Sequence, residues 1–120
     1  MNGIVHIVDD EEVIRDSLSW LIGSEDIACQ TWARGEDFLA DLPDTHPACF
    51  ILDVRMDGLN GPAVFQQMLD AGSDIPVIFL TGHAEVPLAV EALKSGAFDF
   101  VEKPFNDNRL VALVRQALDH

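Results

Sequence analysis

Basic residues are scarce in this chain, whose 120 residues include 7 Lys and Arg against 21 Asp and Glu, a formal net charge of −14. Such an excess of negative charge repels a phosphate backbone, so DNA binding by this segment itself is nearly excluded. No window approaches the roughly 20 apolar residues of a membrane span. Residues 1–8 also lack the basic start and long apolar run of a signal peptide. We therefore expect a cytoplasmic protein.

Cysteine is also rare. Cys29 and Cys49 stand too far apart for a CxxC pair, and no His or second Cys lies at zinc-ligand spacing around either one. We interpret both as small buried residues rather than as redox or metal-binding groups.

Apolar residues are abundant enough for a core, with 48% of the chain hydrophobic and 23% charged. A chain of 120 residues suits one compact domain, because single cores typically organise roughly 100–150 residues. We expect one domain over residues 1–120, with no repeat, linker or low-complexity tail.

Short apolar runs alternate with amphipathic stretches along the whole chain. The predicted strands cover residues 4–8, 27–32, 49–52, 77–80 and 98–101. The predicted helices cover about residues 12–23, 35–42, 62–71, 87–94 and 107–118. This alternation implies a doubly wound α/β domain, a five-stranded parallel sheet with helices on both faces.

Polar side chains stand at the ends of four of the five predicted strands. These residues are Asp9, Asp10, Asp53, Thr81 and Lys103. Because the carboxyl ends of parallel strands meet at one edge of the sheet, where functional crevices form, we expect these side chains to lie close together.

Three neighbouring carboxylates repel one another and need a counter-charge. Oxygen ligands without Cys or His suggest a hard cation, and two or three carboxylates plus water suit Mg²⁺ better than Ca²⁺. Lys103 adds a positive charge and Thr81 a hydroxyl donor, a pair that suits a phosphoryl group bridging the metal. Asp53 ends a buried central strand and is the best-placed nucleophile for aspartyl-phosphate chemistry.

Each of these residues also has a plainer interpretation. The acidic residues 9–12 could simply cap the first helix, Thr81 alone is more typical of a helix cap, and Lys103 alone of a solvated loop. The joint pattern favours the site. His6 alternates with apolar neighbours and is interpreted as a core residue, whereas His83, two residues after Thr81, is expected to modulate the site rather than act as a base.

Four motifs resemble the receiver domain of two-component response regulators, the CheY-like superfamily. They are VDDEE at residues 8–12, LDVRM at 52–56, TGHAEVPLAVEALKSGAFDF at 81–100 and EKPF at 102–105. The resemblance covers essentially the whole chain and implies the strand order 2-1-3-4-5 with five helices. The stretch at 81–105 is most similar to the FixJ type, whose receivers usually precede a LuxR-type helix-turn-helix, with the NtrC type second.

The resemblance implies a role for each site residue. Asp53 is the phosphoacceptor, Asp10 a direct Mg²⁺ ligand, and Asp9 a partner of the metal through bound water. Arg55 offers its backbone carbonyl to the metal, and Lys103 pairs with a phosphoryl oxygen.

The resemblance also implies a conformational switch. Thr81 moves toward the phosphoryl group on activation, and Phe100 turns inward as Thr81 leaves room, a population shift biased by a new local charge. The bond between Lys103 and Pro104 is expected to be cis.

One residue departs from the family's pattern. Asp57 stands where family members often carry Pro, which adds negative charge and removes rigidity from the loop, so we expect slower phosphorylation or faster phosphate loss than with Pro. The side chains of Arg55 and His83 occupy positions that tune phosphate lifetime in the family.

The helix at 87–94, the last strand and the last helix form the family's usual output and dimerisation surface. Val90, Lys94 and Phe100 lie on or near it, although Val90 could equally be core and Lys94 a solvated cation. A hydrophobic contact exposed by phosphorylation would produce a homodimer. The partners implied are a sensor histidine kinase and, through a C-terminal effector domain outside this segment, DNA.

The sequence thus predicts a phosphorylatable switch rather than a turnover enzyme. One alternative is a Mg²⁺-dependent phosphohydrolase, which would carry a second acid where Arg55 stands. The other is a receiver-like interaction module that takes no phosphate, against which the intact set of site residues argues.

Overall fold

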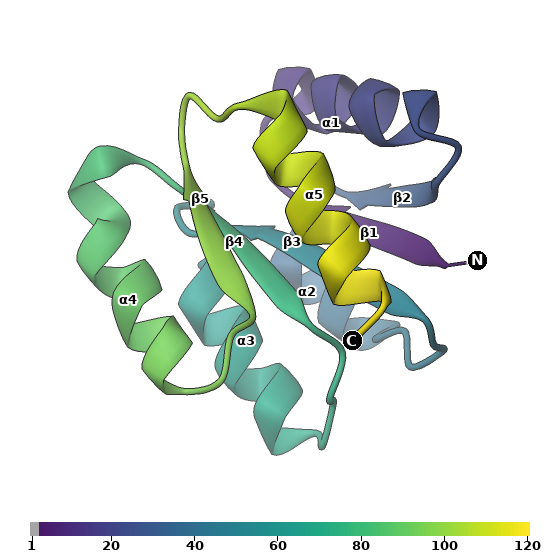
Figure 1. The fold of residues 1–120 in the computed structure, drawn as a ribbon. Helices are drawn as coiled ribbons and strands as arrows, with labels where there is room; N and C mark the ends of the chain where they lie inside the picture. The colour runs from purple at the N-terminus through teal and green to yellow at the C-terminus, as the bar shows by residue number, and fades with distance from the viewer. Residues whose placement is uncertain (1–2) are drawn as a thin grey trace.

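The computed structural model describes residues 3–120, which form a five-stranded sheet between two layers of helices (Figure 1). The strands are β1 (Ile4–Val8), β2 (Ala28–Trp32), β3 (Ala48–Asp53), β4 (Val77–Thr81) and β5 (Asp99–Glu102). All pairings are parallel, in the order β2-β1-β3-β4-β5. The predicted doubly wound fold and its strand order are confirmed.

The helices divide between the two faces of the sheet. Helices α1 (Glu12–Ser24) and α5 (Asp107–Leu118) cover one face, while α2 (Gly35–Ala40), α3 (Gly61–Asp70) and α4 (Val86–Lys94) cover the other (Figure 1). A short 3₁₀ turn, η1 (His83–Glu85), leads into α4. None of the helices in residues 3–120 is both long and apolar enough to cross a membrane.

The central strands supply both hydrophobic cores. Along β3, Phe50 packs toward α2 and α3, whereas Ile51 packs toward α1 and α5. Every residue of β3 and β4 is buried, as their continuous apolar runs predict. The polar side chain in each of these strands belongs to its last residue, Asp53 in β3 and Thr81 in β4.

Three details differ from the sequence-based expectation. Cys49 is buried as predicted, but Cys29 is only half-buried, because β2 is an edge strand with one side toward solvent. Helix α2 ends at Ala40 rather than Leu42, since Pro43 disfavours helical backbone at the residue before it. The turn η1 precedes Pro87, where the helix was predicted to begin.

His6 is a core residue, as predicted. It is 4% exposed, and the indole Nε1 of Trp32 donates to its Nδ1 over 3.3 Å. Burial lowers the pKa of His6, which keeps the ring neutral and able to accept this bond.

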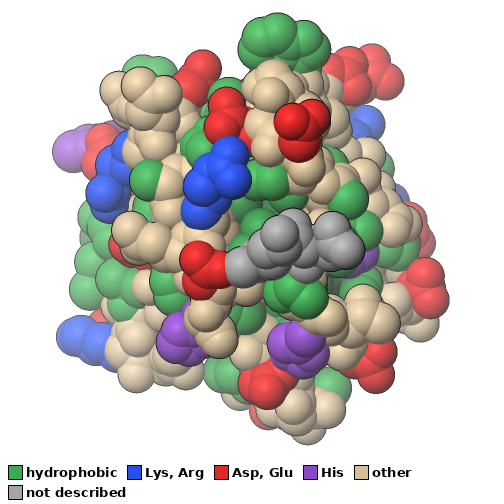
Figure 2. All heavy atoms as spheres, turned by 45° about the vertical axis from the view of Figure 1, so that its right-hand side comes forward, with side chains coloured by type: hydrophobic (Ala, Val, Ile, Leu, Met, Phe, Trp, Pro, Cys, Tyr) green, Lys and Arg blue, Asp and Glu red, His purple; other side chains and the backbone are tan. Residues whose placement is uncertain are grey.

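The bond between Lys103 and Pro104 is cis, as the resemblance implied, and the His46–Pro47 bond is cis as well. On the face shown in Figure 2, basic side chains stand as isolated groups among acidic and apolar ones, in keeping with the net charge of −14.

Candidate functional site

Carboxylates from two neighbouring strand ends meet at the carboxyl edge of the sheet. Oxygen atoms of Asp9, Asp10, Glu11 and Asp53 lie within 4.8 Å of one another. The first three follow β1 and Asp53 ends β3, the adjacent strand. The structure thus brings together the three predicted carboxylates and adds Glu11, which the sequence analysis missed although it continues the acidic run VDDEE.

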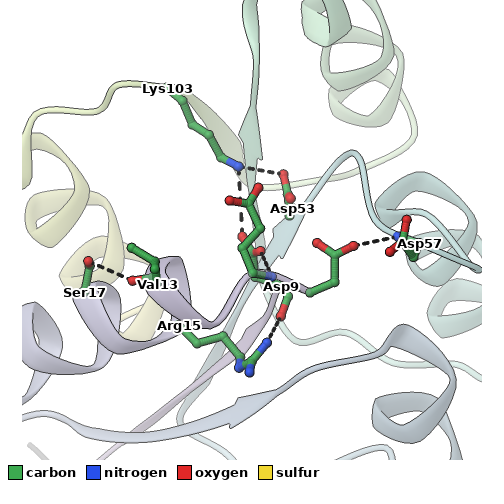
Figure 3. A network of polar contacts seen from close by, with 9 residues as sticks. Asp9, Val13, Arg15, Ser17, Asp53, Asp57 and Lys103 are labelled. Atoms are coloured by element: carbon green, nitrogen blue, oxygen red, sulfur yellow. Dashed lines mark hydrogen bonds and ion pairs between the residues drawn. The ribbon is translucent and has the colours of Figure 1, made fainter.

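Lys103 reaches this cluster from the end of β5 (Figure 3). Its Nζ lies 3.1 Å from Oδ1 of Asp53 and 4.0 Å from Oδ2 of Asp9. The backbone amide of Lys103 donates to the carbonyl of Thr81 over 2.8 Å, which anchors the residue to β4. The ammonium therefore neutralises charge where both carboxylates are almost fully buried.

Asp9 is fully buried, and only one of its two carboxylate oxygens accepts a hydrogen bond. Its Oδ1 accepts from the amide of Glu11 over 2.9 Å, whereas Oδ2 has no hydrogen-bond partner in the described part of the chain. Burial raises the pKa of Asp9 and the charge of Asp53 adds to this increase, whereas the Glu11 amide and Lys103 oppose it, and the net pKa is about 6. This bond does not cap α1, because the N-cap residue is Glu11 and the helix has no side-chain cap, so the Oδ2 atom of Asp9 is available to a cation.

Asp53 is the last residue of β3, and its side chain is 4% exposed. Burial raises the pKa of Asp53, while Lys103 and the backbone amide of Arg55 stabilise the charged form. The first residue of helix α3, Gly61, lies against the backbone of Asp53. The approach is so close that a Cβ on Gly61 would clash with the Asp53 carbonyl. Gly61 therefore lets the helix approach the site, a role that its place in a glycine-containing loop did not reveal.

Asp10 is held by the loop that follows β3. The backbone amide of Asp57 donates to Oδ2 of Asp10 over 2.8 Å (Figure 3). The side chain of Asp57 itself is exposed. Proline at this position would have no amide proton, so the contact exists only because the chain departs from the pattern noted above.

The donor set fits a hard divalent cation. The four acidic groups offer only oxygen, with no Cys or His among them. One buried oxygen of Asp9 lacks a partner, and the single charge of Lys103 does not balance the carboxylates. Mg²⁺, which is held by few carboxylates and several waters, suits this arrangement.

The two predicted switch residues, Thr81 and Phe100, lie on the neighbouring strands β4 and β5. Thr81 is fully buried at the end of β4, and its Oγ1 donates to the carbonyl of Gly82 over 2.9 Å. In this state its hydroxyl bonds to the neighbouring backbone rather than to Asp53. Phe100 on β5 is half-buried and packs against the core beneath α4.

Two side-chain pairs connect the segment after β4 to neighbouring strand ends. Arg55 Nε lies 3.0 Å from Oε1 of Glu85, and His83 Nδ1 lies 3.3 Å from Oε2 of Glu102. The sequence analysis singled out Arg55 and His83 but missed both partners, because the members of each pair come from different strand ends.

The predicted output surface carries exposed apolar groups. Val90 on α4 is 37% exposed, which rules out its interpretation as a core residue, and Leu88 is 48% exposed. Lys94 is solvated at the end of the helix and lies 3.6 Å from Glu91. Phe100 lies on the adjacent strand β5.

A family model for the response regulator receiver domain matches residues 5–115. The chain is 57% identical to the C4-dicarboxylate transport transcriptional regulatory protein DctR of Rhodobacter capsulatus, over 98% of this chain and 61% of that protein. It is 41% identical to the transcriptional regulatory protein FixJ of Bradyrhizobium diazoefficiens, over 97% of this chain and 57% of that protein. The chain thus spans about three fifths of these relatives.

Solved structures agree with this assignment. The crystal structure of FixJ-N superposes with a TM-score of 0.93 at 39% identity, covering 100% of this chain and 96% of that one. Full-length FixJ from B. japonicum gives a TM-score of 0.92 at 41% identity, covering 98% of this chain and 58% of that one. The chain belongs to the response regulator receiver domains, the signalling switches of two-component systems, and within them resembles the FixJ and DctR receivers.

Proposed function

We propose that this receiver domain accepts a phosphoryl group on Asp53 from a phosphohistidine of a sensor histidine kinase. The observation that carries the proposal is the contact between Lys103 Nζ and Asp53 Oδ1, 3.1 Å, beside a buried oxygen of Asp9 that has no hydrogen-bond partner. The carboxylate of Asp53 is thus a nucleophile beside one positive charge, and the remaining negative charge around it can be neutralised by a second cation.

In the proposed reaction a carboxylate oxygen of Asp53 attacks phosphorus. The bond between phosphorus and the donor's histidine nitrogen breaks, its electron pair returns to the ring, and an acyl phosphate remains on Asp53. Lys103 pairs with a phosphoryl oxygen, because its ammonium already lies within bonding distance of the carboxylate. Burial of Asp53 excludes competing water and strengthens each charge interaction.

Mg²⁺ would be held by Asp10 and the backbone carbonyl of Arg55 directly, and by Asp9 through bound water. When bound, it supplies positive charge that neutralises the phosphoryl oxygens. The oxygen-only donor set and the unpartnered Oδ2 of Asp9 support this assignment.

The proposed switch starts from the state described above, with the Thr81 hydroxyl bonded to Gly82. A phosphoryl group on Asp53 offers Thr81 stronger acceptors than a neutral carbonyl. As Thr81 moves, Phe100 turns inward and the surface of α4 and β5 changes. Exposed Val90, with Lys94 and Phe100 nearby, then forms a homodimer contact, and a C-terminal effector domain outside this segment binds DNA.

The proposal is tested by incubating the purified domain with Mg²⁺ and acetyl phosphate and recording intact mass and light scattering. Wild type is expected to gain one labile phosphoryl group and to shift toward dimer. Asp53→Asn should gain none, whereas Asp57→Asn, the same change on an exposed loop residue, should still be modified. No adduct on wild type, or an adduct that persists in Asp53→Asn, would overturn the assignment and favour an interaction module that takes no phosphate.

A further inference from the structure

An ion pair joins the segment that leads from Thr81 to α4 to the loop that follows β3. Arg55 Nε lies 3.0 Å from Oε1 of Glu85, the last residue of η1. The Arg55 side chain is 83% exposed and that of Glu85 only 17%. The more buried member of the pair is therefore Glu85, and the solvated member is Arg55.

Arg55 also lies close to Asp53 along the chain. It follows Asp53 by two residues, and its backbone amide lowers the pKa of the Asp53 carboxylate. The long guanidinium side chain thus starts beside any group carried by Asp53, yet in this state it points to Glu85. A planar guanidinium binds phosphoryl oxygens well, since its several N–H groups can form more than one bond to them.

Glu85 is linked to the switch residue through a single carbonyl group. The carbonyl of Gly82 accepts from the hydroxyl of Thr81 over 2.9 Å and from the backbone amide of Glu85 over 3.1 Å. A shift of Glu85 would therefore disturb the acceptor that holds the Thr81 hydroxyl. The pair between His83 and Glu102 contacts the same segment on the β5 side and does not involve Asp53.

We propose that Glu85 is a positioning residue that acts through Arg55. It holds the guanidinium away from Asp53 in the unphosphorylated domain, and the phosphoryl group on Asp53 competes with Glu85 for Arg55. Exposed ion pairs are weak, whereas a phosphoryl group brings a charge of about −1.5 to −2, so the competition favours release of Glu85. Release loosens the Gly82 carbonyl and frees Thr81. The competition step rests on the function proposed above, but the contact itself does not.

The first test is amide hydrogen exchange on the unphosphorylated domain. The Glu85 amide, protected by the Gly82 carbonyl, reports opening of the segment. Glu85→Gln and Arg55→Gln are each expected to speed its exchange about two- to threefold, with no further gain in the double variant. Glu91→Gln, the same change in the α4 pair with Lys94, should have no effect. Unchanged exchange in Glu85→Gln, or additive effects in the double variant, would overturn the proposed contact.

The second test is the rate of modification by acetyl phosphate with Mg²⁺. Glu85→Gln is expected to raise the rate about two- to threefold, because Arg55 is then free to bind the incoming phosphoryl oxygens. The same change in an Arg55→Gln background should leave the rate as it is, a dependence that a purely structural role of Glu85 would not produce. Equal acceleration in both backgrounds would refute action through Arg55. If wild type takes no phosphoryl group at all, the proposed function and the competition step both fail, while the exchange result still decides whether the pair holds the segment.

Discussion

The backbone amide of Asp57 donates a 2.8 Å hydrogen bond to Oδ2 of Asp10, so the loop after the proposed phosphoacceptor holds a proposed metal ligand. Asp57→Pro removes this bond, removes a negative charge and stiffens the loop in one step. We expect the Pro variant to be phosphorylated about threefold faster, or to lose phosphate correspondingly more slowly, measured by intact mass after addition and removal of acetyl phosphate.

Asp57→Ala separates these contributions, because it keeps the amide proton and removes only the charge. If the charge dominates, Asp57→Ala reproduces the rate of Asp57→Pro, and if the tether to Asp10 or the stiffness of the loop dominates, it resembles wild type. Identical kinetics in wild type and Asp57→Pro would contradict the expectation.

Asp9 is expected to destabilise the metal-free fold at neutral pH. Its pKa is about 6 in the folded state against an ordinary value of 3.8, so the folded state binds the proton more tightly. Stability contributed by this group is therefore present below about pH 4 and is lost as pH rises toward 6. Asp9→Asn should raise the free energy of unfolding at pH 7 in chelator by about 1–3 kcal/mol, measured by urea denaturation.

With Mg²⁺ present, wild type should become more stable than Asp9→Asn. The cation is expected to stabilise wild type at pH 7 by binding only the folded state, and to stabilise Asp9→Asn much less. A variant that is less stable than wild type in chelator, or that responds fully to Mg²⁺, would show that Asp9 is satisfied in some other way.

Gly61→Ala is expected to displace the backbone of Asp53, since the new methyl group has no space beside that carbonyl. Overpacking of this kind costs about 1–3 kcal/mol, and phosphorylation should slow as the nucleophile shifts. Gly23→Ala is the matched control, because a Cβ at that exposed helical position meets nothing within 4 Å. It should stabilise the domain by about 0.5–1 kcal/mol and leave phosphorylation unchanged. Thermal unfolding and intact mass give both readouts.

Val90→Asp is expected to abolish dimerisation after phosphorylation while leaving the phosphoryl adduct intact. A charge at a desolvated apolar contact costs several kcal/mol, enough to keep the domain monomeric at micromolar concentration. Val13→Asp makes the same change on α1, where Val13 is 73% exposed, and should still dimerise. Light scattering distinguishes the two, and a dimer that survives Val90→Asp would place the interface elsewhere.

The fold could be predicted almost to the residue, because β3 and β4 consist of uninterrupted apolar runs that end in a polar residue. The same rule located Asp53 and Thr81. Side-chain geometry could not be predicted in this way, since nothing in the acidic run beginning at Asp9 shows which carboxylate is buried and unpartnered. Nor does a sequence show that Arg55 turns to Glu85, because that choice depends on how two separate strand ends come together.

In the central strands β3 and β4, the apolar residues pack in the core and the last residues, Asp53 and Thr81, belong to the site. The segment after β4, residues 82–85, contributes no buried side chain to either core. It can therefore be exchanged with the corresponding segment of a relative at little cost to folding. Under the proposed role of Glu85, a chimaera that replaces this residue is expected to keep the thermal stability of its host while its rate of phosphorylation changes, so signalling speed can diverge between relatives while their scaffold stays the same.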